Sequence, residues 1–333
     1  MVSGTPSNST NNSGMPCQNN PQGIVGKILP PVLILEMIVG LPGTLLALWI
    51  FCFSLKQKWK ANTLFLFNLV LADFFLLVSV PFRIHNILHG EYWWFGDAWC
   101  RINLFMLAVN RSASIAFMTT VAVDRYLKVV HPHHRINQMT KNQAPLLAFL
   151  IWAVVLALRL PLLAEPLLDK RNNTSLCRSF GFHTINPGII IHYVVYIGEF
   201  FLSLAMLIFC TARITCVLHQ RKLDREPKVQ RAVRTVATIV AVFVVCFSPG
   251  IMMGIVGWAF MRLEQDCKRA GMVSQLFRLS IGFTYLNSAL DPIIYSLSSS
   301  MFRNALKSLF YSLTPGGKYR EGRNLRRSTN TDG

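Results

Sequence analysis

Long apolar segments, separated by short polar ones, dominate the pattern of hydrophobic and polar positions along the chain. A run of about 20 predominantly apolar residues is long enough to cross a bilayer as a helix. The segments that meet this criterion are residues 27–55, 62–89, 98–130, 143–166, 188–219, 229–261 and 272–297. The pattern therefore predicts an all-α membrane protein, a seven-transmembrane helix bundle over residues 27–297.

The segments that flank this bundle differ from it in composition. Residues 1–26 are polar, rich in Asn and Ser and show no evident cleavable signal peptide, so we expect a disordered N-terminus. Residues 298–312 place apolar side chains on one face and Arg303 and Lys307 on the other, which predicts a short amphipathic eighth helix on the membrane surface. Residues 313–333 are basic and rich in Ser and Thr, and they predict a disordered tail that can be phosphorylated.

The charge of the chain is strongly basic, at +18, although only 14% of the residues are charged. A basic balance can indicate a nucleic-acid partner, but here the Lys and Arg residues gather in short segments after the first, third, fifth and seventh apolar runs. All four segments lie on one side of a seven-span bundle. The positive-inside rule makes that side cytoplasmic and the N-terminus extracellular, so the expected partner is membrane lipid and not nucleic acid.

Cysteines and glycosylation sequons support this orientation. Cys17, Cys100, Cys177 and Cys267 fall on the predicted outer side, where an oxidising compartment allows two disulfides. We expect the pairs Cys100 with Cys177 and Cys17 with Cys267. The sequons on the same side start at Asn8, Asn11, Asn172 and Asn173.

The third apolar segment carries a charge where a membrane helix accommodates it least. Arg111 lies about 21 Å from Arg125 along a helix and so well inside the membrane. An arginine near mid-bilayer costs about 2.5–3.5 kcal/mol on insertion scales and should face a cavity with a partner. Its planar fork matches a carboxylate in two parallel hydrogen bonds, so we predict an acidic ligand. The alternative is a structural arginine paired with Glu36, Glu199 or backbone carbonyls.

Several motifs together resemble the rhodopsin-like (class A) G-protein-coupled receptors over residues about 27 to 311. They are Asp124-Arg125-Tyr126, Asn68-Leu69 with Ala72-Asp73, Trp152, Cys246-Phe247-Ser248-Pro249, and Asn287 with Asp291-Pro292-Ile293-Ile294-Tyr295. The resemblance implies that Asp124, Arg125 and Tyr126 couple to a heterotrimeric G protein, with arrestin and receptor kinases as further partners. We expect Arg125 to alternate between Asp124 at rest and the G protein when active.

A closer resemblance is to the branch that holds the hydroxycarboxylic acid and oxoeicosanoid receptors, and within it to the oxoeicosanoid receptor. It rests on Trp94-Phe95-Gly96, Asn103-Leu104-Phe105-Met106-Leu107, Asn110-Arg111, Val129-Val130-His131-Pro132-His133-His134, Glu199-Phe200-Phe201 and Phe283-Thr284-Tyr285-Leu286-Asn287-Ser288. In that branch the arginine that matches Arg111 anchors the ligand carboxylate. The small-acid receptors carry a second arginine where this chain, like the oxoeicosanoid receptor, has Gly254.

Other ligand-binding candidates surround Arg111 in this scheme. Ser179 matches a carboxylate-contacting serine of the branch, and Gly254 enlarges the pocket if it faces inward. Alternatives are loop packing for Ser179, a lipid-facing position for Gly254 and an arginine that only snorkels to the surface for Arg83. The full predicted ligand set is Arg111, Arg83, Ser179, Phe180, Tyr285, Gly254 and Leu107.

A set of polar residues recurs within the apolar segments: Asp73, Asn110, Ser114, Asn287 and Asp291. Asn110 and Ser114, like Asn287 and Asp291, are four residues apart and share a helix face. Oxygen-rich clusters suit a hydrated Na⁺, and the resemblance places the family's sodium pocket at these positions. A water-filled hydrogen-bond network without an ion is the alternative. No other metal or cofactor is expected.

The function that these features predict is a plasma-membrane receptor for an extracellular carboxylate. The resemblance favours an oxo-eicosanoid or related long-chain fatty acid metabolite and signalling through a Gi-type G protein, which lowers cAMP. The alternative ligand is a small hydroxycarboxylic acid of the lactate, hydroxybutyrate or nicotinate type. From another class, a transporter or channel for organic anions predicts an internal hydropathy repeat and broken helices, and neither is evident. No nucleophile and base share a motif, so an enzyme is disfavoured.

Overall fold

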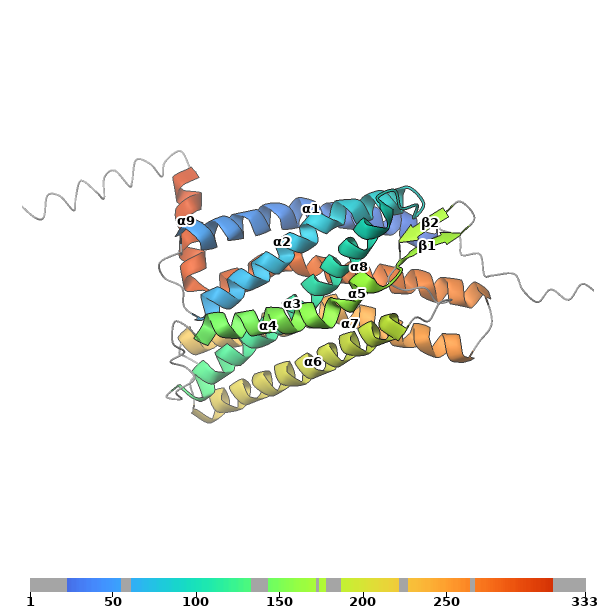
Figure 1. Ribbon diagram of the computed structural model, residues 1–333. Helices are drawn as coiled ribbons and strands as arrows, with labels where there is room; N and C mark the ends of the chain where they lie inside the picture. The colour runs from blue at the N-terminus through green and yellow to red at the C-terminus, as the bar shows by residue number, and fades with distance from the viewer. Residues whose placement is uncertain are drawn as a thin grey trace, which may run out of the picture.

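The computed structural model of the chain describes residues 23–54, 61–132, 143–171, 174–177, 187–221, 227–263 and 267–313. Within these ranges, seven long helices pack side by side into one bundle (Figure 1), which confirms the predicted all-α architecture. The long helices are α1 (Ile24–Trp49), α2 (Ala61–Leu88), α3 (Gly96–Val130), α4 (Gln143–Arg159), α6 (Pro187–Arg221), α7 (Pro227–Leu263) and α8 (Cys267–Ser298).

Short elements mark the two ends of the bundle. A π-helical turn, η1 (Ile50–Ser54), extends α1, and α5 (Pro161–Ala164) follows α4. Strands β1 (Leu168–Arg171) and β2 (Thr174–Cys177) form an antiparallel hairpin at one end, and α9 (Ser300–Leu313) lies across the other end (Figure 1). We call these the hairpin end and the α9 end. The hydropathy pattern does not predict the hairpin.

Six of the long helical segments described are apolar enough and long enough to cross a membrane. The helix that fails this test is α8, because it carries polar residues that point into the bundle. Asn287 and Asp291 are fully buried there, and Arg278 forms a buried ion pair with Glu91 beyond the end of α2. The outward faces are apolar instead: Leu35, Phe149 and Leu202 are 63%, 67% and 70% exposed.

Side-chain packing places α3 at the centre of the bundle. Its residues Phe117, Met118 and Val121 are fully buried and belong to the same core as Phe243 of α7 and Tyr295 of α8. An indole N–H of Trp152 in α4 donates to the side chain of Asn68 in α2, at 2.8 Å. Because α3 contacts α2, α4, α6 and α7, a side chain on α3 can take part in contacts with several helices.

The predicted short helix beyond the bundle is present as α9. Its first turn is capped, because the backbone N–H of Phe302 donates to the Ser299 hydroxyl at 3.1 Å. Phe302 is buried and its ring lies 5.3 Å from that of Phe51 and 5.9 Å from that of Tyr295. This contact fixes α9 to the ends of α1 and α8.

One of the two expected disulfides lies within the described residues. Cys100 of α3 is bonded to Cys177 at the end of β2, so this pairing is confirmed. The bond attaches the hairpin to the start of α3. Cys17 lies outside the described residues, so its pairing with Cys267 stays a prediction, as do the glycosylation sites, which lie outside them as well: Asn8, Asn11, Asn172 and Asn173.

Candidate ligand site

A cavity of about 50 Å³ lies between five helices, on the hairpin-end side of the polar set. Its wall is mostly apolar, with one permanently charged side chain, Arg111. Three predicted ligand residues, Arg111, Leu107 and Tyr285, line it together. The complete lining is Leu76 of α2, Leu104, Leu107, Ala108, Asn110 and Arg111 of α3, Leu162 of α5, His192 of α6, and Ile281, Thr284 and Tyr285 of α8.

Arg111 is buried, with 9% of its surface exposed, and its contacts leave its charge uncompensated. Its Nη2 lies 3.3 Å from Nε2 of His192, and its guanidinium carbon lies 3.6 Å from the centre of the Tyr196 ring. Its Nε is buried without a hydrogen-bond partner. No carboxylate lies within ion-pair distance of it among the described residues.

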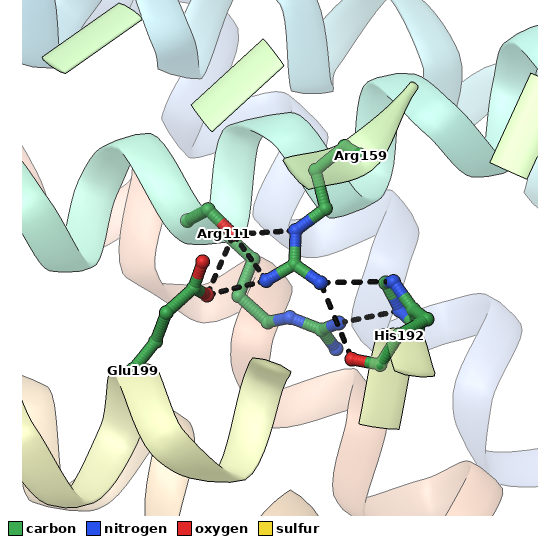
Figure 2. Close-up of polar contacts among 5 residues, drawn as sticks. Arg111, Arg159, His192 and Glu199 are labelled. Carbon is green, nitrogen blue, oxygen red and sulfur yellow. Dashed lines mark hydrogen bonds and ion pairs between the residues drawn. The ribbon is translucent and has the colours of Figure 1, made fainter. Parts of the chain in front are cut away.

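The carboxylate that could have neutralised Arg111 is taken by a second arginine. Arg159, at the end of α4, is fully buried and forms an ion pair with Glu199 of α6. It also donates from Nε and Nη2 to the Ser112 hydroxyl, at 2.9 and 2.6 Å, and from Nη1 to Nδ1 of His192, at 2.9 Å. Figure 2 shows that Arg111 and Arg159 reach the same His192 ring.

Arg159 and His192 were not among the predicted site residues. Arg159 carried a usable signal, because it is the only basic residue in the apolar segment 143–166. A charged side chain in a membrane span needs a partner, and this holds for Arg159 as it does for Arg111. His192 carried no comparable signal, since a single histidine in an apolar helix is ordinary.

The charges at this site do not balance. Two guanidinium groups, Arg111 and Arg159, share one carboxylate, that of Glu199. Burying an unpaired charge is costly, and an ion of opposite sign removes much of that cost. The described residues therefore leave a surplus positive charge at the wall of a cavity, which is the arrangement of an anion-binding site.

Of the remaining predicted ligand residues, Arg83 and Gly254 are described, and neither lines the cavity. Arg83, near the hairpin end of α2, lies close to the Tyr285 hydroxyl. Gly254 does not line the cavity: a Cβ added there would lie 3.2 Å from the Tyr193 ring and 3.5 Å from the Phe277 ring. The aromatic rings therefore fill the space that was expected to enlarge the pocket. Ser179 and Phe180 lie outside the described residues.

The predicted polar set lies together next to the cavity, which Asn110 lines. Asp73 is fully buried and accepts hydrogen bonds from Ser288, at 2.8 Å, and from the Tyr295 hydroxyl, at 2.6 Å. Asn287 donates to Asp291 at 3.0 Å. Ser288 and Tyr295, which were not predicted as members, complete this set.

Several oxygen atoms of the polar set are buried without a hydrogen-bond partner. They are Oδ1 of Asp291, Oδ1 of Asn287 and Oγ of Ser114. Buried polar atoms of this kind need water or an ion. Carboxylate, amide and hydroxyl oxygens are suitable ligands for Na⁺, so the residues present fit such an ion. No cluster of three or more His, Cys, Asp or Glu side chains that could hold a metal occurs in the described part of the chain, the polar set included.

The predicted coupling residues at the α9 end pair differently from expectation. Asp124 forms an ion pair with Lys128, at 2.7 Å, and not with Arg125. Arg125 donates to the backbone carbonyl of Ser298 at 3.1 Å, and Ser298 in turn donates to Asn62 at 3.2 Å. The physical reason is that Lys128 is one helical turn from Asp124 on the same face, while the last carbonyls of α8 offer Arg125 the negative end of a helix dipole.

Seven packed helices around a buried ligand-sized site, with an arginine at the far end of the central helix, define the class of seven-transmembrane receptors. Residues 43–295 match the family described as 7 transmembrane receptor (rhodopsin family), and the chain belongs to this family. It is therefore a multi-pass membrane protein and a G-protein-coupled receptor. The family consists of receptors and not of enzymes, and its assignment displaces the transporter alternative.

Three human relatives place the chain within one branch of the family. Human hydroxycarboxylic acid receptor 2 is 43% identical over 286 residues, which cover 85% of this chain and 77% of the relative. Human hydroxycarboxylic acid receptor 3 is 42% identical over 288 residues, which cover 86% of this chain and 73% of the relative. Human oxoeicosanoid receptor 1 is 39% identical over 306 residues, which cover 91% of this chain and 77% of the relative. The branch predicted from the motifs is confirmed, although identity is higher to receptor 2 than to the oxoeicosanoid receptor.

Proposed function

We propose that this chain is a plasma-membrane receptor that binds an extracellular carboxylate in the cavity at Arg111. The observation that carries the proposal is the buried guanidinium of Arg111, which lines the cavity and has no carboxylate partner among the described residues. A carboxylate would balance the surplus charge and form two charge-assisted hydrogen bonds. In this proposal the N-terminus and the hairpin end are extracellular and the α9 end is cytoplasmic.

The cavity favours a small hydroxycarboxylic acid as the ligand. One water molecule needs about 10–15 Å³ of such volume, so a cavity of about 50 Å³ accommodates a group of only a few heavy atoms. The relatives named for hydroxycarboxylic acids are also 42–43% identical to the chain. A long-chain oxo-fatty acid is the second candidate, because most of the lining is apolar and Gly254 lies behind two rings that could turn aside.

The partners follow from the same proposal. The Gi class of G proteins, with arrestin and receptor kinases, would bind at the α9 end, where Asp124, Arg125 and Tyr126 lie. We also propose that Na⁺ occupies the polar set, because the unpaired oxygens of Asp291, Asn287 and Ser114 offer it ligands. The ion would add positive charge between two buried acids, Asp73 and Asp291, and so stabilise α2 against α8.

A ligand panel in cells tests the proposal. Cells that express the full chain receive lactate, 3-hydroxybutyrate, nicotinate and 5-oxo-eicosatetraenoate, each beside its methyl ester, and the inhibition of stimulated cAMP is measured. We expect at least one acid to act, with its ester at least about 100-fold weaker because the charge is lost. Equal potency of acid and ester would contradict a carboxylate site, and a response to the long acid alone would favour the second candidate.

A further inference from the structure

Two histidines lie one helical turn apart at the hairpin end of α2. The backbone N–H of His89 donates to the carbonyl oxygen of His85 at 3.1 Å, so both residues belong to the last turn of the helix. Their rings are stacked, with centres 4.0 Å apart and planes inclined by 21°. Side chains four residues apart share a helix face, and two imidazoles at this spacing can ligate one metal ion.

The ring of His89 is held in one tautomer. Its Nδ1 lies 2.9 Å from the carbonyl oxygen of His85, and because a carbonyl oxygen can only accept, Nδ1 carries the hydrogen of this bond. A neutral imidazole has one N–H, so Nε2 presents a lone pair. His89 is exposed, so this lone pair is available to an ion in solution. A hydrogen bond from Nδ1 to a backbone carbonyl is the usual support of a histidine that ligates a metal through Nε2.

The ring of His85 offers the second nitrogen. Its Nδ1 is buried and has no hydrogen-bond partner, so an ion from solvent can reach this half-buried ring only through Nε2. Imidazole nitrogens bind Zn²⁺ at about 2.0–2.1 Å, so two of them can be at most about 4.2 Å apart. Corresponding atoms of two rings stacked at 4.0 Å are separated by a similar distance. A small rotation of each ring about its Cβ–Cγ bond then brings both nitrogens to face one ion.

The two acids that follow the histidine pair in the chain are already paired. Glu91 forms a buried ion pair with Arg278, and Asp97 forms an ion pair with Arg101. No third His, Cys, Asp or Glu completes a metal cluster within the described residues, so water takes the remaining coordination positions. A site with two protein ligands and water is open to solvent and exchanges its ion, in contrast to a closed structural zinc site.

We propose that His85 and His89 form a binding site for a divalent transition-metal ion such as Zn²⁺. Imidazole ligands suit Zn²⁺, Cu²⁺ and Ni²⁺, whereas Mg²⁺ and Ca²⁺ prefer oxygen ligands. A bound ion joins the two ends of the last turn of α2 and so stabilises it. The hairpin end is extracellular in the function proposed above, so the site takes its ion from outside the cell. The binding itself does not depend on that function, because neither histidine lines the cavity at Arg111.

A zinc titration of the purified full-length protein tests the proposal. The protein is purified through a tag without histidine, and the apparent Kd for Zn²⁺ is measured by calorimetry for the wild type, His85→Phe and His89→Phe. A phenyl ring keeps the stacked contact and removes the ligating nitrogen. We expect one equivalent of Zn²⁺ to bind at least about tenfold more weakly in each variant, because even the loss of a group that supports a ligand costs about 10–100-fold in metal affinity.

The matched control removes another exposed pair of metal-ligating side chains, Cys216 and His219, three residues apart on α6. Cys216→Ala/His219→Ala should bind Zn²⁺ like the wild type. The same affinity and stoichiometry in the wild type and in His85→Phe/His89→Phe would overturn the proposal and leave the stack as an aromatic contact alone. Alanine replaces phenylalanine in any variant that is not stably produced, and the melting temperature without metal shows whether each variant is folded.

Discussion

At the scale of single residues, pairing distinguishes the two buried arginines near the cavity. Arg159 has Glu199 beside it and is neutralised, whereas Arg111 has an aromatic ring and an imidazole. A cation–π contact contributes about 0.5–2 kcal/mol and leaves the charge in place. Removal of Arg111 should therefore weaken ligand binding more than it weakens the fold.

The substitution Arg111→Ala tests this expectation. We expect a loss of about 100-fold or more in ligand potency, because two charge-assisted hydrogen bonds contribute about 3 kcal/mol or more together. Cell-surface expression should stay near the wild-type level. Potency is measured by cAMP inhibition with the most active acid of the panel.

A matched control is available on the same helix. Arg101 pairs with Asp97 near the hairpin end, where both side chains are partly exposed. Exposed ion pairs contribute little, so Arg101→Ala should change potency by less than about threefold. A similar loss of potency in both variants would count against a specific role for Arg111.

The sequence predicted Arg111 as a site residue for a physical reason. A charge in an apolar segment is costly wherever it lies, and that cost can be read without knowing the fold. The identity of its neighbours cannot, because Tyr196 and His192 lie on another helix and meet Arg111 only after packing. For the same reason Glu199 could not be assigned to Arg159 in advance.

At the scale of helices, α4 is fixed by a few polar contacts to its neighbours. Trp152 bonds Asn68 of α2, and Arg159 bonds Ser112 of α3 and Glu199 of α6. Much of the outward face of α4 is exposed and apolar, and its small inner side chains Ala144, Ala148 and Val155 join the core, so these polar contacts add to a limited apolar packing. The polar contacts at the end of α4 should therefore contribute measurably to stability.

The single and double variants of this ion pair should differ in stability. Arg159→Met leaves the partly buried carboxylate of Glu199 without its charged partner and should cost about 3 kcal/mol, while Arg159→Met/Glu199→Met should recover most of that loss. The measurement is the thermal unfolding of purified protein in detergent or nanodiscs. A double variant no more stable than the single one would show that the pair itself supplies net stability.

A sodium effect is expected where α2, α3 and α8 meet. Replacing choline chloride by NaCl at equal ionic strength should raise the unfolding temperature of the wild type, because an ion that binds only the folded state stabilises it. Asp73→Asn removes the central carboxylate and should abolish the difference between the two salts. The control is Asp97→Asn, which replaces the acid of the partly exposed ion pair with Arg101. This variant should still unfold at a higher temperature in NaCl than in choline chloride. The same sodium shift in Asp73→Asn would refute the proposed ion site.

The helices themselves were predictable because hydropathy is a local property of the chain. The segment predicted at 98–130 is observed as Gly96–Val130, and that at 62–89 as Ala61–Leu88. The β1–β2 hairpin was not predictable, since its strands have four residues each and only the pairing holds them. The Arg125 contact with Ser298 was missed because it joins residues 173 positions apart.

At the scale of the whole molecule, α3 runs from the covalently held hairpin to the α9 end. The disulfide between Cys100 and Cys177 closes a loop with a sequence separation of 77 residues. In the chain-entropy model a loop of this length stabilises the folded state by about 4.5 kcal/mol. The bond also fixes the hairpin beside the cavity, since Leu162, which lines the cavity, belongs to the same apolar cluster as both cysteines.

Removal of this bond should therefore lower both stability and ligand potency. We expect Cys100→Ala/Cys177→Ala to unfold at a lower temperature and to need more acid for the same cAMP response. The Cys216→Ala variant is the control, because Cys216 is exposed on α6 and unbonded. An unchanged potency in the double variant would mean that the hairpin has no part in shaping the site.

The limited apolarity of α8 has a consequence for how the protein is made. A segment that carries Asn287, Asp291 and Arg278 is a poor substrate for insertion into lipid by itself, yet its polar side chains are buried once it lies against α1 and α7. Its entry into the membrane during biosynthesis should thus depend on helices that were inserted before it. The last helix of the bundle would then be the step at which a misassembled chain is retained and degraded by the cell.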